Sequence, residues 1–288
     1  MHRLNFTDHR RELLQNRYVY AVVSRRAGGL SIGINLNPDK TCNFDCPYCQ
    51  VDRRITGGPR DIDLSILRKE LTHLLSLFQE GELWQISPFS TAREEHRRLV
   101  DISFSGDGEP TICPDFLGAV QLVVRIKNEF HLQEVQLNLF SNATVFQKEK
   151  VRKGLEALWS GGGRVWAKLD AGSEDWYQRV DGSKVPFHRV LGNIEWAAQQ
   201  HPIVLQCMFH RFGEERPSSK ERMLWASRID NIFAQGGDIS WIQVYTTARK
   251  PAQKDVLPLQ KEELEQIAQA AQEVVDKWGR STRVTVSG

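Results

Sequence analysis

The sequence predicts an α/β fold in which parallel strands are joined by crossover helices. Short apolar runs alternate with longer segments of helical periodicity along most of the chain. This alternation is typical of parallel sheets, because two parallel strands need a long connection between them. The chain has 288 residues, of which 40% are hydrophobic, and this is enough for one large globular domain.

Seven short apolar or alternating runs are the expected strands. They cover residues 18–24, 31–36, 101–105, 135–140, 164–170, 203–209 and 241–246. We interpret the first as an N-terminal β extension, which leaves six strands in the repeating strand–helix part. Six units are two short of an eight-stranded barrel, so the period alone allows either an open barrel or a doubly wound sheet.

The expected helices lie between these strands. Residues 61–80 place Leu67, Leu71 and Leu74 on one face, and Gly81 follows where a C-terminal cap belongs. The same periodicity predicts helices over residues 114–130, 147–159, 188–200, 220–234 and 259–278. In the insertion 81–99, Thr91 followed three residues later by Glu94 predicts the capped start of a short helix.

Composition narrows the possible functions. Lys+Arg 38 against Asp+Glu 36 gives a formal net charge of +2, which offers no broad electrostatic reason to bind nucleic acid. Eight Trp and thirteen Phe argue against a disordered chain. No apolar run approaches the ~20 residues of a membrane span, and no signal peptide is evident, so we expect a cytoplasmic protein without a membrane partner.

Three of the five cysteines fall on one short segment, Cys42, Cys46 and Cys49, with the spacing C-x3-C-x2-C. Three thiolates can hold three corners of an iron–sulfur cube, whereas structural zinc needs four ligands. The pattern favours a catalytic cluster with an open position. Structural zinc or a ferredoxin-like electron carrier, each with a distant fourth ligand, remains an alternative. We expect Cys113 and Cys207 to be buried free thiols.

This segment resembles the radical S-adenosylmethionine (radical SAM) superfamily, in which an aromatic residue, here Tyr48, precedes the third cysteine. The resemblance implies a partial (β/α)6 barrel of radical SAM type, with the cysteine loop after its first strand. It also implies a 4Fe–4S cluster whose open iron binds S-adenosylmethionine. We expect one domain over residues 1–288, with a core of about 18–258 and a C-terminal helix and tail at 259–288.

Further candidate site residues follow the expected strands. Gly106, Asp107, Gly108 and Glu109 resemble the superfamily motif that holds the methionine amino group of S-adenosylmethionine. Read without the family, this segment is only a tight turn.

Polar residues close the later strands. Ser141 and Asn142 stand where other members contact the cofactor, although an ordinary capping turn explains them equally well. Lys168 and Asp170 share one face of a strand, where burial would require a partner or ligand. Arg249 follows the sixth repeating strand, where a guanidinium can clamp an anionic group. We assign catalytic roles to Lys168, Asp170 and Arg249, and cofactor contacts to Tyr48, Lys168 and the strand-end residues above.

Most of the chain resembles a bacterial branch grouped with the wyosine-forming tRNA synthases, but it has no cysteine before Cys42 for their second cluster. We therefore expect a radical SAM enzyme that generates a 5′-deoxyadenosyl radical and abstracts hydrogen from a small-molecule or peptide substrate. A flavodoxin- or ferredoxin-type reductant would supply the electron. The alternatives are a tRNA-modifying radical SAM enzyme, with Arg25, Arg53 or Arg97 in basic clusters, and a non-catalytic iron–sulfur or zinc protein.

Overall fold

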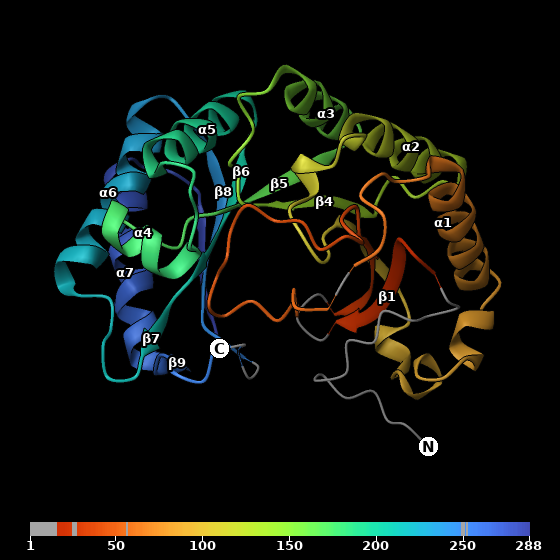
Figure 1. The fold of residues 1–288 in the computed structure, drawn as a ribbon, viewed down its shortest axis with the longest axis horizontal. Coiled ribbons are helices and arrows are strands. Elements are labelled where there is room, and N and C mark those ends of the chain that lie inside the picture. Colours follow the sequence, from red (N-terminus) through yellow and green to blue (C-terminus); the bar gives the residue numbers. More distant parts are fainter. Residues whose placement is uncertain (1–15, 25–27, 56, 249–250, 252) are drawn as a thin grey trace. The chain divides into compact units, whose positions relative to one another are not determined.

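The computed structural model describes residues 16–24, 28–55, 57–248, 251 and 253–288 (Figure 1). The chain forms two compact units. The first comprises Met1–Thr41, Thr56–Phe140 and Glu149–Arg164, and the second comprises Cys42–Ile55, Ser141–Lys148 and Val165–Gly288. That residues 1–288 act as one domain stays a prediction.

The first unit is built on a parallel sheet with an antiparallel hairpin at its N-terminal end. Its strands are β1 (Val19–Ser24), β2 (Gly29–Ile34), β3 (Leu99–Phe104) and β4 (Gln136–Ser141). β1 pairs antiparallel with β2, while β2, β3 and β4 run parallel to one another. The predicted N-terminal β extension is therefore confirmed.

Three helices belong to the first unit: α1 (Leu64–Gln79), α2 (Phe116–Glu129) and α3 (Glu149–Ser160). α1 begins after Asp63, whose side chain accepts hydrogen bonds from the backbone N–H groups of Ser65 and Ile66. Its leucine face is buried, and Gly81 follows in the left-handed conformation with φ 77°. α2 packs against both α1 and α3.

The prediction that Thr91 caps a helix is wrong. Thr91 ends the 3-10 turn Phe89–Thr91, and its hydroxyl donates back to the carbonyl of Pro88 at 2.8 Å. The next turn, Glu94–His96, follows Arg93 and has no side-chain cap. The hydroxyl is thus occupied by the preceding turn and is not available to a following one.

The second unit carries four further parallel strands: β5 (Gly163–Lys168), β6 (Ile203–Met208), β8 (Ile239–Tyr245) and β10 (Arg283–Ser287). They pair in that order. A separate antiparallel pair joins β7 (His210–Phe212) to β9 (Val256–Pro258). The sequence did not predict β7, β9 or β10, since two of them have three residues each and the third follows the last expected helix.

The helices of the second unit are α4 (Glu174–Asp181), α5 (Phe187–Gln200), α6 (Ser219–Ala234) and α7 (Lys261–Lys277). α6 packs against α5 and α7, and α7 also contacts β8 and β10, so these helices cover their part of the sheet (Figure 1). α4 was not predicted, because its eight residues are too short for a clear helical period.

The predicted α/β class with a mostly parallel sheet is confirmed. The seven expected strands all occur, each within two residues of its expected limits, and the six expected helices lie within three residues of theirs. Among the described residues, no helix is long and apolar enough to cross a membrane. Parallel strands bring their carboxyl ends to one edge of a sheet, which is where ligands of such folds bind.

Candidate functional site

The cysteine loop, residues 42–49, has no helix or strand and is held in the second unit by hydrogen bonds. The amide of Asp45 donates to the carbonyl of Asp181 at 2.9 Å, and the Ser183 hydroxyl donates to the carbonyl of Asn43 at 2.9 Å. At its other end, the amide of Gln253 donates to the carbonyl of Pro47 at 3.3 Å. The loop is therefore positioned by the protein itself.

Gly182 allows this close approach at the end of α4. Its φ of 58° lies in the left-handed region, and a Cβ there would come within 2.8 Å of the Asp45 carbonyl oxygen. A larger residue would face both backbone strain and a clash with the loop. The segment Asp181-Gly182-Ser183 thus holds the cysteine loop in place, although none of its three residues was predicted from the sequence as part of the site. The Asp-Gly pair, a common turn signal, was the available clue.

The three cysteines of the loop are half-buried and form no disulfide. The Cys46 thiol donates to Asp181 at 3.7 Å, and Arg53 donates to the sulfur of Cys49 at 3.4 Å. Burial raises the pKa of Cys46, so iron must displace a proton to bind there.

Within the described ranges, no three His, Cys, Asp or Glu side chains already form a metal cage. The cysteines fit an iron–sulfur cluster through their thiol chemistry and their place on one partly exposed loop. The three ligands expected from the sequence thus lie on one loop, and their binding of a cluster is argued below as a proposal.

A buried ion pair lies beside the loop, also in the second unit. Lys168 Nζ is 2.6 Å from Asp170 Oδ2, and the hydroxyl of Tyr48 accepts from Lys168 and donates to Asp170. The other carboxylate oxygen of Asp170 accepts from the amide of Met208 at 2.9 Å. The Asp170 side chain is 0% exposed and that of Lys168 18%, so the lysine is the member that a ligand could touch.

Electrostatics fix the charges of this group. Burial lowers the pKa of Lys168, but Asp170, Tyr245 and other nearby groups together raise it by more, so the amine stays an ammonium. Burial raises the pKa of Tyr48, which stays a phenol, and burial with the nearby Asp170 charge raises the pKa of Asp181. Lys168 and Asp170 do lie together, as their predicted common face requires, with Tyr48 as their link.

Ser141 ends β4, and Asn142 follows it and contacts the cysteine loop. The Ser141 hydroxyl accepts from the amide of Ala143 at 3.0 Å, and Asn142 Oδ1 accepts from the amide of Thr144 at 3.2 Å. Asn142 Nδ2 donates to Asn43 Oδ1 at 2.7 Å and approaches the Cys42 sulfur at 3.9 Å. Asn142 therefore combines the expected turn with a contact to the cysteine segment.

The turn from Gly106 to Glu109 lies in the first unit, after β3. A Cβ on Gly108 would come within 1.9 Å of the Thr41 carbonyl oxygen, which accepts from the Glu109 amide at 3.1 Å. This approach requires glycine at position 108. The Glu109 side chain is buried, and its Oε1 accepts from the Thr111 hydroxyl at 2.5 Å. A carboxylate in this place can accept from a ligand's ammonium group.

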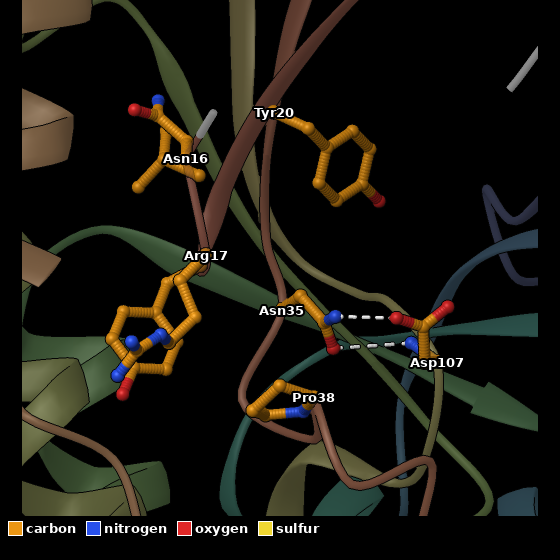
Figure 2. Close-up of a pocket in the computed structure, with 8 residues that line it drawn as sticks. Asn16, Arg17, Tyr20, Asn35, Pro38 and Asp107 are labelled. Carbon is orange, nitrogen blue, oxygen red and sulfur yellow. Dashed lines mark hydrogen bonds between the residues drawn. The ribbon is translucent and has the colours of Figure 1, made fainter. Parts of the chain in front are cut away.

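Asn35, which directly follows β2, clamps this turn. Its Nδ2 donates to Asp107 Oδ2 at 2.6 Å, and its Oδ1 accepts from the Asp107 amide at 3.1 Å, as Figure 2 shows. The pair borders a pocket of about 220 Å³, which is also lined by Arg17 just before β1, by Tyr20 on β1 and by Pro38. A cavity thus adjoins Asp107 at the carboxyl ends of β2 and β3.

His210 is a residue that the sequence analysis missed. It begins β7 and is 1% exposed, and its ring packs edge-on against Tyr48 at 5.2 Å and Phe212 at 4.9 Å between centroids. Neither ring nitrogen has a hydrogen-bond partner among the described residues. The available signal was its place two residues beyond β6, where the other strands also carry polar groups. Arg249 lies outside the described residues, so its role stays a prediction.

Acid should destabilise the protein through His210. Burial lowers its pKa from the ordinary 6.5 to about 4, so the unfolded chain takes up this proton at a higher pH than the folded protein does. The free energy of unfolding should therefore fall by about 3 kcal/mol as the pH drops through this window, at 1.36 kcal/mol per pKa unit. Urea unfolding between these pH values measures the effect.

His210→Phe keeps a ring between Tyr48 and Phe212 and should remove this part of the pH dependence. The exposed His188 provides the matched control. An unchanged pH dependence in His210→Phe, or an equal loss in His188→Gln, would contradict the assignment.

Cys113 and Cys207 are both buried and form no disulfide, as expected. Cys113 lies in the first unit and Cys207 on β6 in the second, and burial raises the pKa of each thiol. Among the described residues, neither belongs to a group of three or more side chains that could hold a metal ion.

Comparisons with known proteins agree with this architecture. The family described as "Radical SAM superfamily" matches residues 36–216, more than half of the chain. A radical SAM methyltransferase from Sphaerobacter thermophilus is 10% identical with a TM-score of 0.61, covering 93% of this chain and 68% of that one. A structure of TYW1 with a lysine–pyruvate adduct bound is 15% identical with a TM-score of 0.52, covering 86% and 74%. Identities this low show the fold, which is the predicted partial barrel.

Curated relatives are more similar in sequence but longer. A protein named GTPase Obg from Brachyspira hyodysenteriae is 25% identical over 193 residues, which are 66% of this chain and 25% of that protein. A UPF0026 protein from Helicobacter pylori is 26% identical over 164 residues, which are 57% and 46%. The chain thus spans a quarter to about half the length of these relatives. From the family match over more than half of its length, we conclude that this chain belongs to the radical SAM superfamily, whose enzymes use a 4Fe–4S cluster and S-adenosylmethionine.

Proposed function

We propose that this chain is a radical SAM enzyme that abstracts a hydrogen atom from a small-molecule or peptide substrate. When bound and reduced, the cluster would supply one electron to S-adenosylmethionine, which cleaves its sulfonium bond to give methionine and a 5′-deoxyadenosyl radical. Radical SAM enzymes need a reductant and a substrate, and a flavodoxin- or ferredoxin-type protein is the reductant that we propose. Cys42, Cys46 and Cys49 would hold the cluster.

The observation that carries this proposal is the ion pair beside the cysteine loop. A lysine and an aspartate are buried at the end of β5, and Tyr48, on the loop itself, bonds to both. Buried charges need such partners, and a site of this kind marks a functional region. We propose that Asp170 holds Lys168 in place, and that the partly exposed ammonium binds a carbonyl or carboxylate oxygen of the substrate.

The cofactor contacts are assigned by matching chemistry to position. Glu109 would accept from the methionine ammonium, while Gly106, Asp107 and Gly108 bring backbone close to it. Ser141, Asn142, Tyr48 and Lys168 are the other cofactor contacts that we propose. Arg249 is proposed as a clamp for an anionic substrate group.

The basic clusters support a small substrate over tRNA. Arg53 faces Cys49, and Arg54 pairs with Asp52. Arg97 and Arg98 donate to the backbone carbonyls of Ala92 and Gly28. Each of these guanidinium groups already has a partner within the protein, which leaves fewer of its donors for a phosphate backbone. Arg25 lies outside the described residues.

Reductive cleavage of the cofactor tests the proposal. Protein reconstituted anaerobically with iron and sulfide, then reduced with dithionite, should release 5′-deoxyadenosine and methionine from S-adenosylmethionine even without a substrate, although slowly. Chromatography of the quenched mixture measures both products. Stoichiometric zinc without iron, or iron-loaded protein that forms no deoxyadenosine, would instead support a non-catalytic metal protein.

A further inference from the structure

Arg53 lies just beyond the cysteine loop and points back to it. It is half-buried, and its Nη1 donates to the Cys49 sulfur at 3.4 Å. Both residues belong to the second unit, within the segment Cys42–Ile55. A cation is thus in hydrogen-bond contact with one of the three proposed cluster ligands.

The guanidinium carries a full positive charge, because arginine is not deprotonated in proteins. Its hydrogen bond places that charge directly against the Cys49 sulfur. By Coulomb attraction it should favour negative charge on this ligand.

We propose that Arg53 raises the reduction potential of the iron–sulfur cluster held by Cys42, Cys46 and Cys49, an inference that rests on the proposed function. Reduction adds one electron to the cluster, and a neighbouring positive charge stabilises the more negative state. An N–H donor to a ligand sulfur acts in the same direction. Arg53 would act through the Cys49 sulfur. It is therefore a positioning residue that tunes the cluster, and not a residue that contacts substrate.

The next residue provides a matched control. Arg54 has the same side chain and the same formal charge, but its guanidinium is 2.8 Å from Asp52 and its side chain is 91% exposed. Its charge is therefore compensated by Asp52 and screened by water. A variant at either position removes one positive charge from the same stretch of chain, and only Arg53 is bonded to a cysteine sulfur.

The test is a potentiometric titration of the reconstituted full chain, followed by the electron paramagnetic resonance of the reduced cluster. Arg53→Met should shift the reduction equilibrium toward the oxidised form by about tenfold, which is a potential about 59 mV lower for one electron. Arg53→Lys should recover most of the shift, because it keeps the charge. Arg54→Met should change the equilibrium by less than about twofold.

Two results would overturn the inference. One is an equal potential in Arg53→Met and the unaltered protein at equal iron content. The other is loss of the cluster in Arg53→Met with full loading in Arg53→Lys, since Arg53 would then hold the cluster and not tune it. A protein that assembles no cluster at all removes the proposed function first, whereas a cluster with an unchanged potential removes only the role of Arg53.

Discussion

Replacing Cys42, Cys46 or Cys49 singly with alanine should reduce the iron content from about four atoms per chain to near zero. Each sulfur would supply one corner of the cluster, and two remaining ligands are too few to hold it. The fold should survive, because a backbone bond from the loop to Asp181, a backbone bond from Gln253 and a side-chain bond from Ser183 position the loop. Iron analysis and visible absorption of the reconstituted variants measure the loss of the cluster, and circular dichroism measures whether the fold survives. Release of 5′-deoxyadenosine should disappear with the iron.

Cys113→Ala and Cys207→Ala are the controls for this series. Both thiols are buried, and both lie far from the cysteine loop along the sequence. Both variants should therefore keep the cluster. Retained iron in Cys49→Ala would contradict the ligand assignment. So would iron lost from a folded Cys207→Ala, since that sulfur would then be a ligand.

Breaking the buried pair should have the largest effect on stability. In Asp170→Asn the shape of the side chain is kept, but the Lys168 ammonium loses its counter-charge inside the protein. Removing one partner of a buried pair costs about 3–5 kcal/mol of the free energy of unfolding. Lys168→Met should also destabilise the protein, because Asp170 then loses its cationic partner and keeps neutral donors such as the Tyr48 hydroxyl and the Met208 amide. Urea unfolding at neutral pH measures each change.

The double variant separates this explanation from simple loss of packing. Lys168→Met with Asp170→Asn should cost less than the sum of the single variants, by about 1–3 kcal/mol, since neither charge is then left alone. The exposed pair Lys153–Glu149, with side chains 58% and 82% exposed, is the control. Lys153→Met should change the free energy of unfolding by less than about 1 kcal/mol. Additive effects at Lys168 and Asp170 would contradict the coupling.

The sequence predicts the fold well where the helical or strand spacing of apolar residues extends over enough positions to be recognised. The leucine face of α1 and the apolar runs of β3 and β6 could be predicted, because apolar residues recur there over several residues. α4 and β7 were missed, since eight and three residues carry too little of a period. The capping prediction at Thr91 was wrong because the motif Thr-x-x-Glu cannot tell which neighbouring turn takes the hydroxyl.

The candidate site follows the same rule. The cysteines, the Gly106–Glu109 turn and the common face of Lys168 and Asp170 could be predicted, because each is a local pattern at a strand end. Asp181, Ser183 and His210 are distant in sequence from the residues that they contact, so no local spacing reveals them. Asn35 was hidden in another way, since it closes an ordinary strand and its bond to Asp107 spans 72 positions.

The attachment of the cysteine loop to the end of α4 has a consequence for oxygen damage. Air that destroys an iron–sulfur cluster leaves the cysteines behind, and in many small metal-binding domains the chain then unfolds. Here the hydrogen bonds to Asp181 and from Ser183 involve no metal, so the emptied loop keeps its place. Repair would then need only thiol reduction, iron and sulfide, and no refolding of the chain around them.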